Sequence, residues 1–154
     1  MSTLELVEDL QRRYVAQIDD GELEGWPDFF TDDAHYKIIS KEALDAGQVI
    51  GFYVCNGKGM LHDRILTLRK TAIYEQQFYR HMISATIIED ESDGVITAST
   101  NYMVVRTTQD GDMTVFSAGR YRDTIVAENG EPRFKEKLVV TDSNKMDTLL
   151  AIPI

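Results

Sequence analysis

The sequence predicts an α+β fold, with helices first along the chain and a curved, mostly antiparallel mixed sheet after them. Two observations support this prediction. Over the first 20 residues, apolar side chains recur at steps of three and four, which is typical of an amphipathic helix. From residue 73 onward, β-rich stretches are separated by Ser-Asp-Gly, Gln-Asp-Gly and Glu-Asn-Gly, which favour tight antiparallel turns. At 154 residues, the chain suits a single domain, residues 1–154.

The N-terminal segment is expected to form two helices. Ser2 or Thr3 can cap the first, and the helix should end near Asp19–Gly21, where glycine adopts a left-handed conformation. A second short helix is expected over roughly residues 22–30, with Pro27 in its first turn. The apolar stripe of the first helix consists of Leu4, Val7, Leu10, Tyr14 and Ile18.

The remaining elements follow from the same patterns. Strands are expected over 34–40 and 48–55, a helix over 57–72, and four strands over 79–90, 94–108, 112–127 and 132–143. In residues 102–105 (YMVV), the side chains that would point to either face of a strand are all apolar, so this strand should be covered on both faces. The final residues 149–154 (LLAIPI) are expected to fold back onto the core or to be buried against another subunit.

Charge and composition narrow the range of partners. The chain has 16 basic and 26 acidic residues and a formal net charge of −10, which argues against nucleic acid and anionic membranes as partners. No apolar run approaches the length of about 20 residues that a bilayer span needs. The acidic N-terminus is unlike a signal peptide, and Cys55 is the single cysteine, so we expect a cytoplasmic protein with Cys55 as a small buried hydrophobe.

The sequence offers weak candidates for chemistry. The three histidines, His35, His62 and His81, form no closely spaced pair, so we expect no metal site, although distant strands could gather two histidines and a carboxylate. In WPDFFTDDAHYKI (residues 26–38), the polar side chains suit a helix-to-strand corner better than an acid–base site. His35 and Tyr36 should face opposite sides of the strand that follows.

Arginines on the strand 112–127 form a second group. Arg120 and Arg122 should share one face with Phe116, while Tyr121 and Asp123 take the other. In so acidic a protein, we expect the arginines to meet carboxylates of this chain or a neighbouring chain. An anion-binding pocket is the alternative.

Several segments together resemble the small (β) subunits of aromatic-ring-hydroxylating Rieske oxygenases, most of all those acting on aromatic carboxylic acids such as terephthalate and salicylate. The resemblance implies a cone-shaped, NTF2-like (cystatin-like) fold. The matching segments are WPDFFTDDAHYKI, MLHDRILTLRKTAIYE, FYRHMIS, ASTNYMVVR, VFSAGRYRDTI and KLVVTDSNKMDTLLAIPI.

The resemblance also implies a role. The chain would be a structural subunit of a dioxygenase complex in aromatic catabolism, without a catalytic residue or cofactor of its own. A large α subunit would hold the Rieske [2Fe–2S] cluster and a mononuclear iron, and three copies of each chain would form an α3β3 hexamer. One cysteine cannot supply the two that a Rieske cluster needs. Candidate interface residues are Trp26, Tyr79, Arg80, Arg120 and Arg122.

The alternative hypothesis is a stand-alone enzyme of the same superfamily, an isomerase or dehydratase with a pocket inside the cone. Its acid–base groups would be Tyr36, His81 and Asp33. Such catalysis requires the three groups to converge on one cavity.

Overall fold

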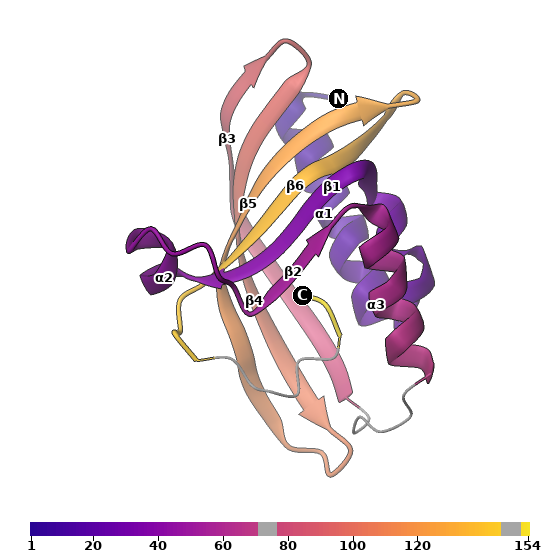
Figure 1. Ribbon diagram of the computed structural model, residues 1–154, viewed down its shortest axis with the longest axis vertical. Coiled ribbons are helices and arrows are strands. Elements are labelled where there is room, and N and C mark those ends of the chain that lie inside the picture. Colours follow the sequence, from indigo (N-terminus) through magenta and orange to yellow (C-terminus); the bar gives the residue numbers. More distant parts are fainter. Residues whose placement is uncertain (71–76, 146–151) are drawn as a thin grey trace.

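The computed structural model describes residues 1–70, 77–145 and 152–154, and its element order matches the expected one (Figure 1). Helices come first, and long strands make up the second half. In chain order the elements are α1 (Thr3–Asp19), η1 (Leu23–Phe29), β1 (Phe30–Ser40), α2 (Lys41–Asp45), β2 (Tyr53–Asn56), α3 (Lys58–Lys70), β3 (Gln77–Ser92), β4 (Val95–Thr108), β5 (Met113–Glu128) and β6 (Glu131–Thr141).

Helix α1 is built as the periodicity predicts. The Ser2 hydroxyl accepts from the Glu5 backbone N–H, and the Glu5 carboxylate accepts from the Ser2 N–H, which completes a capping box. The stripe from Val7 to Ile18 is buried, but Leu4, in the first turn of the helix, is 41% exposed. The helix ends at Asp19, and Gly21 has a φ of +76°.

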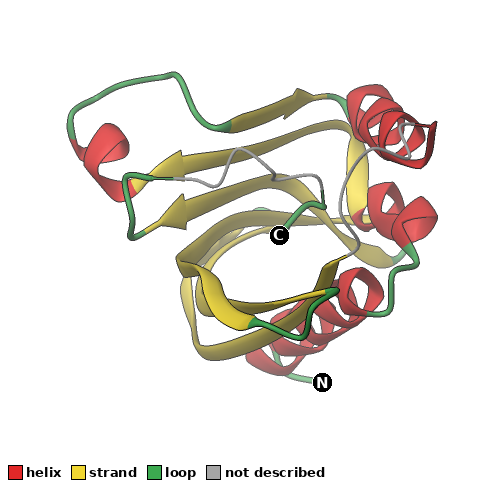
Figure 2. Ribbon diagram, turned by 90° about the horizontal axis from the view of Figure 1, so that it is seen from below, coloured by secondary structure: helices red, strands yellow, loops and turns green. Residues whose placement is uncertain are grey.

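The described strands form one six-stranded sheet in the order β2-β1-β6-β5-β4-β3. The strands from β3 to β6 form an antiparallel meander, and β1 is parallel to β6, so the sheet is mixed as expected. Asp93 and Asn129 adopt positive φ in the predicted turns, where a short polar side chain tolerates that conformation. The sheet curls, with α1, η1 and α3 gathered to one side and α2 apart from them (Figures 1 and 2).

Two local predictions are wrong. The strand expected over residues 48–55 is confined to β2, because Val49 and Ile50 are 79% and 83% exposed in the loop before it. Helix α2 was not predicted, although Ser40 caps it by accepting from the Ala43 backbone N–H. It has only five residues and no buried side chain, so it leaves no hydrophobic periodicity in the sequence.

Helix α3 lies within the predicted range of 57–72 and ends at Lys70; residues 71 and 72 fall outside the described part. Its buried side chains are Leu61, Ile65 and Leu68, at the predicted helical spacing.

The core is an aromatic cluster between the helices and the concave face of the sheet. Trp26 and Phe30 pack edge to face against Tyr36, with ring centroids 5.1 and 6.0 Å away. Ile154 is fully buried in the same cluster, so this end of the chain folds back onto the core, one of the two expected alternatives. Residues 149–151 of that prediction lie outside the described part.

Candidate functional site

The structure does not bring the predicted acid–base trio together. Tyr36 is buried in the aromatic core, and its hydroxyl bonds to the backbone of Ile154. Asp33 is exposed on β1 and accepts from the Thr31 hydroxyl, which lowers the pKa of its carboxyl group. His81 pairs instead with Asp19. These three groups therefore line no common pocket among those described, and the geometry that the alternative hypothesis requires is not seen in the described part of the chain.

The pairing of His81 with Asp19 was not predicted. His81 Nδ1 lies 2.6 Å from one Asp19 carboxylate oxygen, and the His81 backbone N–H donates to the other at 2.8 Å. The carboxylate thus ties the C-terminal end of α1 to β3. The two residues are 62 positions apart, and no local pattern in the sequence signals such a contact.

The other sequence candidates for chemistry are dispersed. His35 is exposed and bonds to the Asn56 side chain, while its neighbour Tyr36 faces inward, as predicted. Across residues 1–70, 77–145 and 152–154, no three His, Cys, Asp or Glu side chains gather as a ligand set for a metal ion. Cys55 is buried, and burial raises the pKa of its thiol, which disfavours the reactive thiolate form.

The deepest polar feature is a cluster of Gln11, Asp123 and Lys137, all fully or almost fully buried. Lys137 Nζ lies 3.3 Å from each Asp123 carboxylate oxygen and 3.1 Å from Gln11 Oε1. The Gln11 amide nitrogen in turn donates to Asp123 at 2.5 Å. The cluster therefore bonds α1 to β5 and β6 through charge-assisted hydrogen bonds.

Aromatic rings surround the ammonium group of this cluster. Lys137 Nζ lies 4.4 Å from the ring centroid of Tyr14, 3.8 Å from that of Tyr121 and 4.1 Å from that of Phe134. Burial penalises both charges: it lowers the pKa of Lys137 to about 8 and raises the pKa of Asp123. The arrangement fixes the helix on the sheet, and no open cavity reaches it among the described pockets.

A β-bulge explains why the sequence did not reveal this cluster. Phe134 and Lys137 are three residues apart and would face opposite sides of a regular strand. The pairing of β5 with β6 shifts register between Phe134 and Glu136, so both side chains point inward. A similar shift between Val104 and Val105 turns Phe116 toward the core, where its ring lies 5.4 Å from Tyr79. The expectation that Phe116 shares the face of Arg120 is therefore wrong.

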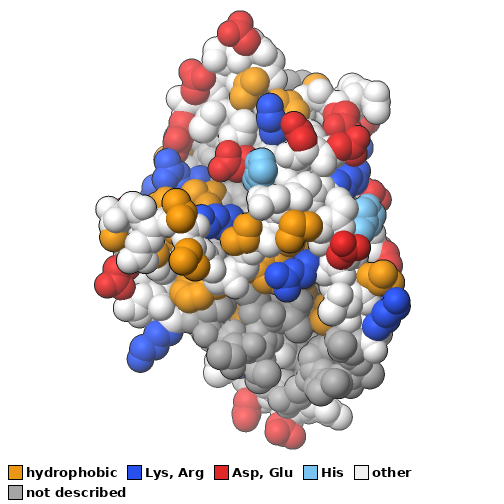
Figure 3. Space-filling view, viewed as in Figure 1, with side chains coloured by type: hydrophobic (Ala, Val, Ile, Leu, Met, Phe, Trp, Pro, Cys, Tyr) orange, Lys and Arg blue, Asp and Glu red, His pale blue; other side chains and the backbone are white. Residues whose placement is uncertain are grey.

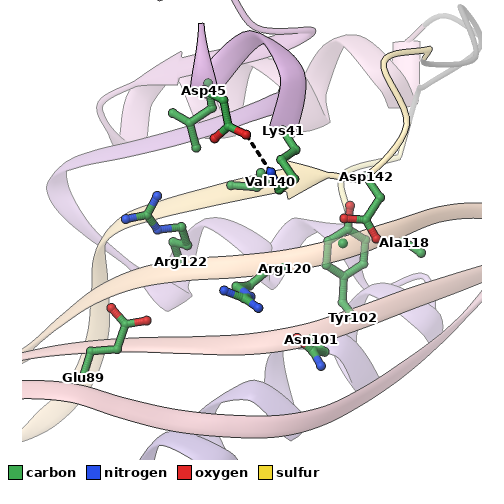
Figure 4. Close-up of a pocket in the computed structure, with 12 residues that line it drawn as sticks. Lys41, Asp45, Glu89, Asn101, Tyr102, Ala118, Arg120, Arg122, Val140 and Asp142 are labelled. Atoms are coloured by element: carbon green, nitrogen blue, oxygen red, sulfur yellow. Dashed lines mark hydrogen bonds and ion pairs between the residues drawn. The ribbon is translucent and has the colours of Figure 1, made fainter. Parts of the chain in front are cut away.

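The outer face of the sheet holds the two predicted arginines in a pocket beneath α2 (Figure 4). Arg120 and Arg122 are exposed on β5, on the face opposite Tyr121 and Asp123, as predicted. The pocket has a volume of about 520 Å³ and also contains the ion pair of Lys41 with Asp45, at 2.6 Å. Neither arginine bonds to a carboxylate of the described residues.

Apolar side chains cover the neighbouring part of this outer face. Phe78 and Met82 on β3 are 55% and 43% exposed, and Met113 and Val115 on β5 are 70% and 62% exposed. Cross-strand pairing places Met103 and Val105 of β4 between them, both half-buried. We call this set the outer patch: Phe78, Met82, Met103, Val105, Met113 and Val115. Within the YMVV stretch, Tyr102 and Val104 are buried, whereas Met103 and Val105 are half-buried, so the expected cover on both faces is incomplete in the described part of the chain.

A second exposed apolar group lies on the loop between α2 and β2. Val49, Ile50 and Phe52 are 79%, 83% and 43% exposed. Figure 3 shows hydrophobic side chains gathered across this face, over α2 and the segment that follows it. Large apolar side chains concentrated at two places on a monomer surface are typical of surfaces that another chain covers.

The predicted interface residues divide into two groups. Arg80, Arg120 and Arg122 are exposed on the outer face. Trp26 is fully buried and Tyr79 is 4% exposed, so both belong to the core of this chain and offer no surface to a partner. Their aromatic character, which suggested interface anchors, serves internal packing instead.

No helix among the described residues is long and apolar enough to cross a membrane. The model of the SnoaL-like domain family matches residues 2–137. The small subunit of anthranilate 1,2-dioxygenase from Burkholderia cepacia is 43% identical over 145 residues, covering 94% of this chain and 90% of that protein. Subunit β2 of the terminal oxygenase component of terephthalate 1,2-dioxygenase from a Comamonas species is 37% identical over 141 residues, 92% of each chain.

A solved structure agrees with these relatives. A protein from Novosphingobium aromaticivorans, assigned as the β subunit of an aromatic-ring-hydroxylating dioxygenase, superposes with a TM-score of 0.90 at 34% identity, over 98% of this chain and 96% of that one. Relatives and structure confirm the resemblance and the fold that the sequence analysis stated. The chain therefore belongs to the SnoaL-like family and, within it, to the small (β) subunits of aromatic-ring-hydroxylating dioxygenases.

Proposed function

We propose that this chain is the single-domain structural subunit of a Rieske aromatic-ring-hydroxylating oxygenase in the cytoplasm. In this proposal a large α subunit holds the Rieske cluster and the mononuclear iron, and three copies of each chain form an α3β3 hexamer. Membership in a family of dioxygenase small subunits supports this role over that of a stand-alone enzyme. The relatives named for anthranilate and terephthalate dioxygenases suggest an aromatic carboxylic acid as the substrate of the complex.

The observation that carries the proposal is the outer patch. Its side chains come from three adjacent strands, so they lie together on one face of the sheet. Obligate subunit interfaces are large and more apolar than ordinary protein surfaces. Covering the outer patch with a neighbouring subunit would also give Met103 and Val105 the second layer that the sequence predicts.

Three arginines are proposed to complete this interface. Arg80 pairs across the strands with Val105, within the outer patch, and Arg120 and Arg122 lie further along the same face. Since none of the described carboxylates of this chain bonds to Arg120 or Arg122, an acidic side chain of a neighbouring subunit is the partner we propose. Arginine is favoured at such positions because its planar fork binds a carboxylate through two hydrogen bonds.

Co-expression with the gene product encoded next to this chain tests the proposal. We expect a brown complex with iron–sulfur absorption, while the chain purified alone should be colourless and free of stoichiometric iron. A monomer that converts an aromatic substrate without a partner would contradict the proposal.

A matched pair of substitutions tests the surface itself. Val115→Asp places a charge in the outer patch, and Leu66→Asp places one on α3, where Leu66 is 53% exposed. We expect Val115→Asp to abolish co-purification while leaving the circular dichroism spectrum unchanged. The Leu66→Asp variant should assemble normally. Equal assembly of both variants would remove the outer patch from the interface.

A further inference from the structure

The outer patch is hollowed along its middle strand, β4. A cavity of about 240 Å³ opens on the surface there. Its lining side chains come from β3, β4 and β5, and one of them is charged. They include Phe78, Arg80, Met82, Val105, Thr107 and Met113.

Strand register explains the shape of this hollow. One cross-strand row runs from Phe78 through Thr107 to Met113, so a small side chain on β4 lies between two large ones. In the next row, Arg80 on β3 pairs with Val105 on β4. Alternation along each strand directs these side chains to the same face of the sheet. The floor of the hollow therefore consists of short β-branched side chains, and its walls consist of longer ones.

The volume of the hollow suits one side chain better than a free ligand. An apolar cavity of about 150 Å³ is enough to hold benzene, whereas small-molecule sites typically measure about 300–1,000 Å³. At about 240 Å³, the hollow has room for one aromatic or large branched side chain. Protein interfaces commonly bury such an anchor in a pocket near their centre.

Methionine is concentrated around the hollow. Three of the six methionines in the chain, Met82, Met103 and Met113, belong to the outer patch. Their unbranched, polarisable side chains adapt to the shape of a neighbouring group. The walls of the hollow can therefore adjust to an anchor without movement of the sheet.

Arg80 determines the charge that the occupant should carry. Its side chain is exposed at the hollow, and no hydrogen bond or ion pair within the described part of the chain involves it. A guanidinium group favours a carboxylate, which it can bind through two hydrogen bonds. The complementary surface therefore combines an apolar anchor with an acidic side chain.

A second copy of this chain meets that requirement poorly. A twofold contact of one outer patch on another would bring two Arg80 side chains into the same interface, and like charges there are unfavourable. Docking the exposed side chains of Val49 and Ile50 would bring Lys37 with them, because its ammonium group donates to the Val49 backbone oxygen. Both arrangements add a cation where Arg80 already lies.

We propose that the hollow is the anchor site for the large subunit, which inserts one aromatic or large branched side chain and places an adjacent Asp or Glu on Arg80. This assignment, which rests on the proposed function, names the chemistry of the segment that covers the outer patch. The anchor and the acid lie close together in the partner, since Arg80 itself lines the hollow.

Filling the hollow tests the anchor. Thr107→Trp fills it from its floor, whereas Thr97→Trp adds the same side chain at the other end of β4, on the same face and also half-buried. Each full-length variant is co-expressed with the unmodified chain and a limited amount of the large subunit, and mass spectrometry gives the ratio of the two chains in the complex. We expect incorporation of Thr107→Trp to fall at least about tenfold and that of Thr97→Trp to stay unchanged. Equal incorporation of both variants would overturn the anchor site.

The same competition tests the acidic partner. Arg80→Glu should lower incorporation at least about tenfold, because it places two carboxylates together. Arg80→Lys should lower it less, since lysine keeps the charge but loses the planar fork. Incorporation of Arg80→Glu at the level of the unmodified chain would overturn the carboxylate contact.

A photocrosslinker identifies the occupant even if a variant does not fold. With p-benzoylphenylalanine in place of Met82, we expect a crosslink to a peptide of the large subunit in which an aromatic or large branched residue lies close to an acidic one. A crosslink to a second copy of this chain, or to a peptide without an acidic residue, would overturn the assignment. If the unmodified chain forms no complex with the large subunit, the proposed function fails. If it does and the variants at the hollow enter the complex equally well, only the anchor site fails.

Discussion

The concave and outer faces of the same sheet differ in how completely their groups are paired. On the concave side, the charges of Asp123 and Lys137 are matched by each other, by Gln11 and by aromatic rings. On the outer side, large apolar side chains face solvent beside arginines that meet no described carboxylate. Folding thus pairs the buried charges of the concave face, whereas the outer face keeps large apolar side chains and arginines exposed, as the proposed subunit contact requires.

The largest effect is expected from Lys137→Met, which leaves the Asp123 carboxylate buried without its cation. We expect a loss of about 3–5 kcal/mol in the free energy of unfolding, measured by urea denaturation. Combining it with Asp123→Leu should recover most of that loss, because an apolar pair of similar volume leaves no unpaired charge. If the double variant is as unstable as the single one, the cost arises from packing and not from charge.

A smaller loss is expected from Asp19→Ala, which removes both bonds to His81. The buried histidine ring and its backbone N–H lose an acceptor, so the free energy of unfolding should fall by about 1–3 kcal/mol. The exposed Asp33→Ala is the control, and a change within about 0.5 kcal/mol is expected there. If Asp19→Ala lowers the free energy of unfolding no more than Asp33→Ala does, the buried pair of Asp19 and His81 adds no stability.

The pH dependence of stability should report Lys137 directly. Burial lowers the pKa of Lys137 from 10.5 to about 8 in the folded chain. Between about pH 8 and pH 10.5 the Lys137 side chain keeps its proton in the unfolded chain and has released it in the folded chain. The free energy of unfolding therefore rises with pH in this range. The stability that Lys137 contributes at high pH is lost as the pH falls through its folded-state pKa. The slope of the free energy of unfolding against pH should exceed that of the double variant Asp123→Leu, Lys137→Met by up to about 1.4 kcal/mol per pH unit. Identical slopes would contradict the lowered pKa.

The smallest effect on folding is expected on the outer face. Arg120→Ala and Arg122→Ala should change the free energy of unfolding by less than about 0.5 kcal/mol, since both side chains are exposed. The same variants should weaken assembly with the large subunit, as measured by co-purification at increasing salt. A loss of stability without a loss of assembly would place these arginines in the fold instead of the interface.

Local patterns predicted the elements that depend on local periodicity. The stripe of α1, the spacing of Leu61 and Ile65 on α3, and the meander turns at Asp93 and Asn129 all follow from short stretches of sequence. Register shifts could not be predicted, because a single extra residue at a bulge reverses the face of every later side chain. This is why the inward position of Lys137 was missed.

The site was less predictable than the fold for a related reason. The contacts that organise the interior join residues far apart in sequence, such as Asp19 with His81 and Tyr36 with Ile154. The exposed arginines were predictable, because strand alternation alone separates Arg120 and Arg122 from Tyr121. Trp26 and Tyr79 were assigned to an interface from residue type, which cannot distinguish an internal aromatic cluster from a contact with another chain.

If the outer face of β3, β4 and β5 is covered in the assembled oxygenase, as we propose, methionine oxidation footprinting should detect that cover most directly. Met113 is 70% exposed in the outer patch, whereas Met60 is 39% exposed on α3 and serves as the internal control. Mass spectrometry should find that Met113 oxidises far more slowly in the complex than in the isolated chain, while the rate at Met60 stays the same. An unchanged rate at Met113 in a verified complex would contradict the claim.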